Sequence, residues 1–343
     1  MSKSVFPFSA IIGQEQMKLS LQMAAVDPTI TGVLVFGDRG TGKTTAMRAL
    51  AALLPELSVV VGCDFGCDPA DADRLCSNCI KAAKEGELTS TKTAAPVVDL
   101  PLGATEDRVV GALDIEKALA HGIKAFEPGI LAAANRGFLY IDEVNLLEDH
   151  IVDILLDVTV SGINVVERDG LSIRHPAQFI LVGSGNPEEG ELRPQLLDRF
   201  GLSVDVTTST DIDERISIVR LRDEFERDPV AFSKRYAMKD QQIRLNIQRA
   251  REALDSIEIS DDVLRRISEL CLELGTDGLR GELTLMRAAR AYAALTHATL
   301  VDESHVSHVA TMALSHRLRR DPLDDSGTTV RVQRAIDSIG LAA

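Results

Sequence analysis

The chain has 343 residues, enough for two domains with full cores, and a formal net charge of −15 from 52 acidic and 37 basic residues. This acidic balance argues against bulk nucleic-acid binding, and the absence of tryptophan argues against a base-stacking surface. No apolar run approaches the length of a membrane span and no secretory signal is visible, so we expect a cytoplasmic protein.

The first two hundred residues alternate short apolar runs with helical patterns. Strands are predicted at 33–36, 58–61, 138–141, 179–183 and 203–206, and helices at 14–26, 43–54, 114–121 and 149–160. This alternation predicts an α/β fold whose parallel sheet is covered by helices on both faces. Asp169 and Gly170, flanked by apolar residues, predict a hairpin over 163–174. Residues 62–110 are rich in Gly, Asp, Pro and Thr, and we expect insertions or loops there.

Strand signals stop at about residue 211. A charged helix is predicted at 212–225, a mobile stretch at 228–242, and further helices at 243–254, 261–274, 281–298 and 303–317. The basic run Arg317, Arg319 and Arg320 is typical of a solvated helix end. We therefore expect an α/β domain over 1–210, a helical linker over 211–245 and a C-terminal α-helical domain over 246–343.

A glycine-rich loop connects the first predicted strand to the next helix. Residues 37–44 read GDRGTGKT and match Gly-x-x-x-x-Gly-Lys-Ser/Thr in full. The glycines allow close approach to a triphosphate, and the helix start directs free N–H groups at it. Lys43 would contact the β- and γ-phosphates and Thr44 would bind Mg²⁺. The predicted nucleotide-binding residues of this loop are Gly37, Asp38, Arg39, Gly40, Thr41, Gly42, Lys43, Thr44 and Thr45.

Two further strands end in polar residues that fit ATP hydrolysis. The run 138–141 ends in Asp142, which would hold the Mg²⁺ of MgATP through water, and Glu143, which would orient or activate the attacking water. Asn186 follows the strand at 179–183 and would also orient water; the alternative is a turn residue before Pro187.

Two arginines are candidates for contacts with the triphosphate. Arg199 would reach the γ-phosphate of a neighbouring subunit and stabilise charge in the transition state. The alternative for Arg199 is an ion pair within the chain, with Asp198 or another acid. Arg280, at the start of a helix in the second domain, would fold over the nucleotide or carry only surface charge.

These residues together resemble an AAA+ ATPase. Ile11 to Gln14 resembles the motif on the adenine side, GDRGTGKTT resembles Walker A and FLYIDE resembles Walker B. Asn186 matches sensor 1, Arg199 the arginine finger and Arg280 sensor 2. Longer segments resemble the I subunit of magnesium chelatase, the ATPase motor of chlorophyll and bacteriochlorophyll synthesis; they cover 97–119, 124–157, 164–177, 181–204, 276–295 and 312–325.

The resemblance implies that ATP hydrolysis drives insertion of Mg²⁺ into protoporphyrin IX, a ligase reaction. It implies a homo-oligomeric ring, expected to be a hexamer, with an active site shared between subunits. It also implies two partners, a second AAA+-like subunit with an integrin-type domain and a large porphyrin-binding subunit, and neither nucleic acid nor a membrane span. Residues 108–130 would form an insertion and 163–175 a hairpin, both projecting toward the ring centre or the partners. In this family the helical domain is displaced, so Arg280 would contact a neighbour's nucleotide or act in only some states.

Three other functions stay open from the residues alone. The first is the corresponding motor of a cobalt chelatase, because another subunit selects the metal. The second is a MoxR-like chaperone or remodelling ATPase with no connection to tetrapyrroles. The third, a nucleic-acid motor, is disfavoured by the charge.

Four of the five cysteines lie in one short segment with the spacing C-x3-C-x8-C-x2-C. Two close pairs are typical of a tetrahedral Zn²⁺ site. Redox-active thiols and reduced surface thiols are the two alternatives. The residues are Cys63, Cys67, Cys76 and Cys79.

Overall fold

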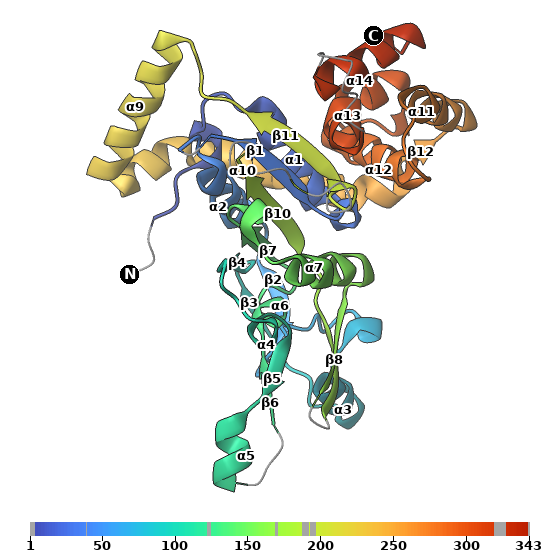
Figure 1. The fold of residues 1–343 in the computed structure, drawn as a ribbon. Helices are drawn as coiled ribbons and strands as arrows, with labels where there is room; N and C mark the ends of the chain where they lie inside the picture. Colours follow the sequence, from blue (N-terminus) through green and yellow to red (C-terminus); the bar gives the residue numbers. More distant parts are fainter. Residues whose placement is uncertain are drawn as a thin grey trace. The chain divides into compact units, whose positions relative to one another are not determined.

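The computed structural model describes residues 4–38, 40–121, 125–168, 171–186, 192, 197–318 and 327–341. The chain divides into two compact units, one formed by Met1–Leu53 with Gly185–Ala343 and the other by Leu54–Ser184 (Figure 1). Arg39 and the predicted turn at Asp169 and Gly170 lie outside the described residues. Within the described part of the chain, none of the helices combines the length and the apolar character that a membrane crossing requires.

The first unit contains a pair of parallel strands. Strand β1 (Val33–Gly37) pairs with β11 (Leu202–Val206), and helix α1 (Glu15–Val26) packs against both strands. The start of β1 is buried without polar alternation, as expected for a strand of a parallel sheet covered by helices. Helix α2 (Lys43–Leu53) follows β1 after the glycine-rich loop.

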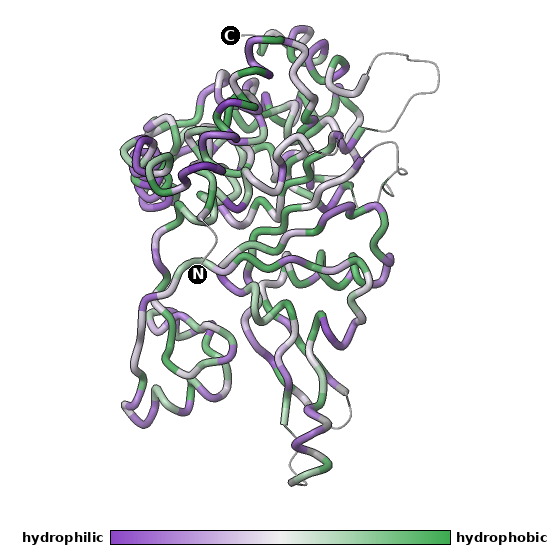
Figure 2. Tube along the Cα trace, turned by 90° about the vertical axis from the view of Figure 1, so that its left-hand side faces the viewer, coloured by the Kyte–Doolittle hydropathy of each residue, from purple (hydrophilic) through white to green (hydrophobic). Residues whose placement is uncertain are grey.

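The rest of the first unit is almost entirely helical. The helices are α9 (Ile212–Arg227), α10 (Pro229–Ala253), α11 (Asp261–Leu274), α12 (Arg280–Leu295), α13 (Glu303–Leu314) and α14 (Thr328–Ser338). Short strands β12 (Glu258–Ile259) and β13 (Leu300–Val301) pair in parallel between them. Hydrophobic and hydrophilic residues are interleaved along these helices, as amphipathic packing requires (Figure 2).

The prediction of helix α11 is confirmed, and the prediction of a mobile stretch at 228–242 is wrong. The Ser260 side chain accepts a hydrogen bond from the Val263 N–H at the start of α11, and Gly275 ends this helix in the left-handed conformation. The supposedly mobile stretch belongs to α10, which spans 25 residues. Its start combines a proline in the first turn with an Asp228 side chain that accepts from the Ala231 N–H at 3.0 Å.

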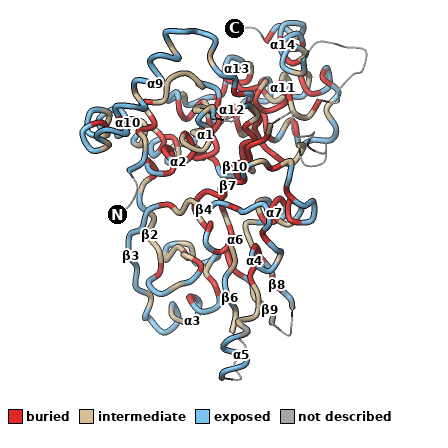
Figure 3. Tube along the Cα trace, turned by 60° about the vertical axis from the view of Figure 1, so that its left-hand side comes forward, coloured by how far each residue is buried: buried red, intermediate tan, exposed pale blue. Residues whose placement is uncertain are grey.

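The second unit contains three parallel strands in the order β10 (Ile180–Gly185), β7 (Phe138–Ile141) and β4 (Val97–Leu100). All four residues of β7 are buried, and Figure 3 shows this burial in red along β7 and β10. The segment 97–100 forms a strand, although the Gly, Asp, Pro and Thr content of residues 62–110 predicted insertions or loops there. The strand predicted at 58–61 exists as β2 (Leu57–Val60), but it pairs antiparallel with β3 (Ser90–Thr93) outside the parallel strands.

Two antiparallel hairpins extend from the parallel strands of the second unit (Figure 1). The predicted hairpin at 163–174 is confirmed as β8 (Ile163–Arg168) and β9 (Leu171–Pro176), which follow helix α7 (Asp149–Ser161). The other hairpin joins β5 (Gly111–Leu113) to β6 (Phe126–Pro128). The helices of this region are α3 (Ser77–Glu85), α4 (Glu106–Val110), α5 (Ile115–His121) and α6 (Ile130–Ala133).

Candidate functional site

The glycine-rich loop lies between β1 and α2 in the first unit. Gly37 has a φ of 142°, and a Cβ atom there would lie 2.0 Å from the Val206 carbonyl oxygen of the paired strand. Gly40 and Gly42 also have positive φ values, 82° and 87°. The loop therefore turns back over the end of β1 in a way that side chains would block, which explains the glycine spacing.

The side chains of Lys43 and Thr41 donate to the backbone of this loop. The Lys43 Nζ donates to the Gly37 carbonyl and, at 3.2 Å, to the Asp38 carbonyl. The Thr41 hydroxyl donates to the same Asp38 carbonyl at 2.9 Å. Helix α2 begins at Lys43, so the N–H groups of its first turn face the loop. Such an arrangement of N–H groups and one ammonium suits a phosphate group.

The N-terminal segment lies against the chain that follows β11. The Gln14 side chain donates to the Thr207 carbonyl at 3.2 Å, and Gln14 itself is left-handed with a φ of 57°. A Cβ atom at Gly13 would lie 2.6 Å from a carboxylate oxygen of Glu214. The predicted adenine-side motif is thus a tight turn that closely contacts residues 207–214.

The two predicted acids follow β7 in the second unit. Asp142 is exposed, and its Oδ1 accepts hydrogen bonds from the Tyr140 hydroxyl at 3.0 Å and the Ser184 hydroxyl at 2.6 Å. Glu143 is left-handed with a φ of 55°, a sparsely populated conformation for a residue with a side chain. Its N–H donates to the Ser184 oxygen at 3.2 Å. One serine therefore orients both acids.

Ser184 was missed by the sequence reasoning. Its side chain is buried, with 1% exposure, at the end of β10, the strand beside β7. The signal was present in a weak form, since the Ser184 hydroxyl lies between Gly183 and Gly185 directly after the strand predicted at 179–183. Asn186 lies two residues further on and is half-buried.

The segment around Arg199 is held in place by the helical part of the first unit. The Arg199 carbonyl accepts from the Thr31 hydroxyl at 3.1 Å, and the residue is half-buried. The carboxylate of the preceding residue, Asp198, pairs with Arg280 and with Arg317. Arg280, the predicted sensor 2 arginine, therefore forms an ion pair with Asp198. Asp198 directly precedes Arg199, the predicted arginine finger.

Arg317 is a buried anchor, so the prediction of a solvated helix end is wrong at this position. Its side chain is 3% exposed and donates to the Phe200 carbonyl at 2.8 Å and to the Thr284 hydroxyl at 3.2 Å, besides Asp198. Burial lowers the pKa of Arg317, and the Asp198 carboxylate opposes that shift. The neighbouring His316 is half-buried, desolvation of its ring lowers its pKa to about 3, and its Nε2 lies 3.0 Å from the Phe200 carbonyl.

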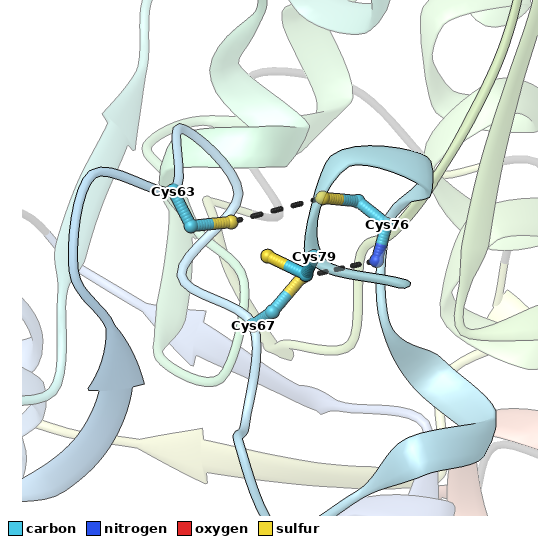
Figure 4. Close-up of side chains that lie close together, drawn as sticks. All are labelled: Cys63, Cys67, Cys76 and Cys79. Atoms are coloured by element: carbon cyan, nitrogen blue, oxygen red, sulfur yellow. Dashed lines mark hydrogen bonds between the residues drawn. The ribbon is translucent and has the colours of Figure 1, made fainter. Parts of the chain in front are cut away.

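The four clustered cysteines meet in the second unit (Figure 4). Their sulfur atoms all lie within 4.8 Å of one another, and every cysteine in the chain is a free thiol. Hydrogen bonds from Cys67 and Cys76 lower the pKa of Cys63, whereas burial raises the pKa of Cys79 to about 12. Cys67, Cys76 and Cys79 are buried, which contradicts the surface-thiol alternative for these three.

Comparison with known proteins agrees with this geometry. The family model of the AAA domain matches residues 31–189, and that of the AAA lid domain matches residues 264–336. The two matches cover the glycine-rich loop, the acid pair and the helices that hold Asp198. The fold and the nucleotide-binding motifs therefore define an AAA ATPase, a class that binds ATP with Mg²⁺, with a helical lid domain, as predicted.

Similar proteins narrow this class to one family. The chain is 60% identical over 336 residues to the magnesium-chelatase 38 kDa subunit of Acidiphilium rubrum, covering 98% of this chain and 97% of that protein. It is 61% identical over 341 residues to the subunit of the same name from Rhodobacter capsulatus, covering 98% and 94%. A cryo-EM-based structure of the complex between subunits BchI and BchD of magnesium chelatase contains a chain with 59% identity and a TM-score of 0.55, covering 96% of this chain and 99% of that one. The chain belongs to the family of the magnesium-chelatase 38 kDa subunit, the I subunit, as its sequence motifs indicated.

Proposed function

We propose that this chain is the ATP-hydrolysing motor of a magnesium chelatase and that its hydrolysis of ATP drives insertion of Mg²⁺ into protoporphyrin IX, a step of (bacterio)chlorophyll synthesis. The observation that carries the proposal is the identity of 60–61% with magnesium-chelatase subunits over nearly the whole chain. A glycine-rich loop and an acid pair with the expected surroundings support it.

The residues of the loop fit a bound MgATP. Gly40 and Gly42, which are exposed and have positive φ values, give the loop a backbone without side chains at the start of helix α2, where N–H groups can bind phosphate oxygens. Lys43 would exchange its two carbonyl partners for the β- and γ-phosphates, and Thr44 and Asp142 would hold Mg²⁺. When bound, Mg²⁺ neutralises charge that develops on the phosphates during transfer. The hydrogen bonds from Tyr140 and Ser184 keep Asp142 oriented for this role.

The remaining groups act on the water and on the transition state. Glu143 would orient the attacking water and accept its proton, and Asn186 would help to position that water. Gln14 would lie on the adenine side. Arg199 would act on the nucleotide of a neighbouring subunit, where an arginine stabilises transition-state charge. Arg280 would contact the nucleotide in some states only, because its guanidinium is paired with Asp198 here.

The proposed assembly is a homo-oligomeric ring, expected to be a hexamer. It would act with a second AAA+-like subunit carrying an integrin-type domain and with a large subunit that binds the porphyrin. The similarity to a chain from the BchI–BchD complex supports the first of these partners. The β5–β6 and β8–β9 hairpins are the elements expected to reach the ring centre or the partners.

Sharing of the active site is tested by mixing two inactive variants. Arg199→Ala lacks the arginine offered to a neighbour, and Lys43→Ala lacks a working loop, so each alone should be inactive. In a mixed ring, a Lys43→Ala subunit would still offer its Arg199 to an Arg199→Ala neighbour with an intact loop. ATPase activity should therefore return at intermediate ratios, and its absence at every ratio would remove support for a shared site.

The function itself is tested by magnesium insertion. The assay combines this chain, ATP and the two candidate partner subunits with protoporphyrin IX, and follows the porphyrin spectrum, with the chain omitted as control. ATP-dependent formation of Mg-protoporphyrin that requires this chain is the expected result. Insertion of cobalt in its place, or ATPase activity stimulated by a client protein without any metallation, would assign the chain to a cobalt chelatase or to protein remodelling.

A further inference from the structure

The four-cysteine segment belongs to a small module of the second unit formed by β2, β3, α3 and the loops between them. Its buried apolar cluster consists, among the described residues, of the three buried cysteines with Val60, Phe65 and Ala132. Half-buried residues pack against this cluster, namely Cys63, Leu75, Leu88, Phe126 and Ile173. So small a cluster stabilises a fold weakly, and small modules commonly gain stability from a disulfide or a bound metal. All the cysteines here are free thiols, so a disulfide does not supply this stabilisation.

The four sulfur atoms converge from two separate segments (Figure 4). Cys63 and Cys67 lie in the loop after β2, whereas Cys76 immediately precedes α3 and Cys79 lies in its first turn. The Cys63 and Cys76 sulfurs are 3.9 Å apart, and all four sulfurs lie within 4.8 Å of one another. A tetrahedral zinc with Zn–S bonds of about 2.3 Å places its sulfur atoms about 3.8 Å apart. The cluster therefore already has nearly the size of a single four-sulfur metal site.

The backbone of the first loop is shaped to present both of its thiols. Gly62 and Gly66 have positive φ values of 73° and 58°, and the Gly66 N–H donates to the Cys63 carbonyl at 3.3 Å. The Cys76 N–H donates to the Cys67 sulfur at 3.2 Å. Backbone N–H groups directed at a ligand sulfur stabilise its thiolate charge, as outer-shell hydrogen bonds do in metal sites.

Other cysteine chemistries fit this arrangement less well. A disulfide needs two sulfurs about 2.05 Å apart, and a redox pair needs only two cysteines, whereas here each sulfur has three sulfur neighbours. An iron–sulfur cluster spreads its cysteine ligands over several irons, so their sulfur atoms stand farther apart than those of a single-ion site. Four thiolates around one ion indicate zinc among the common protein metals.

The first cysteine loop contacts the two hairpins of the unit. The Phe65 ring stacks on His175 of β9, with centroids 4.4 Å apart and planes 15° apart, and lies 6.3 Å from Phe126 of β6. The Phe65 carbonyl accepts from the Asn135 side chain at 2.8 Å, and Asn135 in turn accepts from the Gln178 N–H at 2.9 Å. These contacts lie at the beginnings of β7 and β10.

The position of the cluster indicates a structural role. Asn135 and Gln178 precede β7 and β10, whereas Asp142, Glu143 and Ser184 lie at the ends of the same strands. The cysteine loop and the acid pair are therefore at opposite ends of the parallel strands. An ion held there would not take part in ATP hydrolysis, but it would fix the loop that packs against both hairpins.

We propose that Cys63, Cys67, Cys76 and Cys79 bind one structural zinc ion, and that this ion holds the Phe65 loop against the β5–β6 and β8–β9 hairpins. The site is separate from the nucleotide site and is not needed for the proposed ATPase chemistry.

The direct test is the metal content of the full chain, purified under reducing conditions without a metal-affinity column from cells supplied with zinc. About one zinc per chain is expected, with at least a tenfold loss in Cys67→Ser and Cys76→Ser. Cys271→Ser is the matched control, because it removes a buried thiol from helix α11 and should leave the zinc content unchanged. Less than about a tenth of a zinc in the wild-type chain, iron in place of zinc, or zinc retained by the cysteine variants would overturn the proposal.

A second measurement avoids variants that fail to fold. Zinc is removed from the wild-type chain with a chelator, retention of ATP binding shows that the nucleotide domain is intact, and Co²⁺ is then added. The intense absorption of tetrahedral Co²⁺ bound by thiolates is expected at one equivalent, with competition by Zn²⁺. A folded, ATP-binding chain that shows no such absorption contradicts a four-thiolate site.

Amide hydrogen exchange tests whether zinc holds the Phe65 loop against the hairpins. Removal of zinc should speed amide exchange of β8 and β9 about tenfold or more, because their contact with Phe65 loosens. Exchange of helix α11, in the other unit, should stay unchanged and serves as the internal control. Equal exchange of the hairpin with and without zinc would overturn the supporting role.

Discussion

The loop that follows β1 and the loop that follows β2 use glycines in similar ways but present different groups. In the first, left-handed glycines expose backbone N–H groups, and Gly40 and Gly42 are exposed to solvent. In the second, Gly62 and Gly66 turn the chain so that thiols meet in a buried cluster. One loop thus offers its backbone to a ligand in solvent, whereas the other directs its side chains inward.

This difference indicates what each ligand does for the protein. The first loop is shaped by the chain itself, through the Thr41 hydroxyl, the Lys43 ammonium and the contact of Gly37 with β11. Loss of its nucleotide should therefore remove activity and leave the fold intact. The second loop brings four sulfurs together in a small buried cluster, so loss of its ion should loosen structure and leave the hydrolytic groups in place.

The largest expected effect is that of Lys43→Ala on ATP hydrolysis. Removing the ammonium proposed to contact the β- and γ-phosphates should lower ATPase activity by about a thousandfold or more, with no change in zinc content or melting temperature. The control is Lys81→Ala, which removes an exposed lysine from α3 in the cysteine module. Full ATPase activity in Lys43→Ala would disprove the assignment of the loop.

Glu143→Gln separates binding from hydrolysis at the nucleotide site. The amide cannot accept a proton from water, so turnover should fall about a hundredfold to a thousandfold while ATP binding is retained. Steady-state ATPase rates and equilibrium binding of a fluorescent ATP analogue measure the two effects. Glu148→Gln, at an exposed acid further along, should match the wild type; loss of binding in Glu143→Gln would instead give Glu143 a structural role.

In the cysteine module, Phe65→Ala should lower stability and leave the nucleotide site unaffected. The ring is 9% exposed and stacks on His175, so its removal should destabilise the second unit by about 3 kcal/mol. Phe65→Leu keeps most of the volume and should cost about 1 kcal/mol. Denaturant unfolding measures both, and ATP binding should stay unchanged. A large loss of ATP binding with unchanged stability would contradict the separation of the two loops.

The smallest expected effect is that of Ser184→Ala. The change removes the hydroxyl that donates to Asp142 and accepts from the Glu143 N–H, so both acids lose orientation without losing charge. Turnover should fall about tenfold, which corresponds to about 1.4 kcal/mol. Ser203→Ala, at a buried serine of β11, is the control. Equal rates for the two variants would show that Ser184 does not position the acids.

The parts of the candidate site that the sequence alone points to are those whose groups lie close together in the chain. Residues 37–44 and the pair Asp142 and Glu143 each lie within one segment, so their spacing predicts a nucleotide site, and their roles stay predictions. Ser184 and Arg317 act on partners 42 and 119 residues away, and no local pattern shows such contacts. The cysteine spacing indicated two pairs, but only the fold shows that their sulfurs meet.

The two incorrect predictions of secondary structure, at 97–100 and 228–242, have a related cause. Strand β4 lies in a stretch whose Gly, Asp, Pro and Thr content predicted loops, and its pairing with β7 makes its short apolar run a strand. The first part of helix α10 lies in the stretch 228–242 that was predicted to be mobile, whereas its second part agrees with the helix predicted at 243–254. Its stability comes from its cap at Asp228 and from Phe232, which packs edge-on against Phe225 of α9 with centroids 5.6 Å apart.

The central claim is that ATP hydrolysis in the loop at Gly37 to Thr44 drives magnesium insertion. The most direct test replaces the wild-type chain by Lys43→Ala in the reconstituted reaction with both partner subunits, ATP and protoporphyrin IX. Wild-type chain should yield Mg-protoporphyrin and Lys43→Ala should yield none, although both chains fold and retain zinc. Magnesium insertion by Lys43→Ala at the wild-type rate would contradict the account.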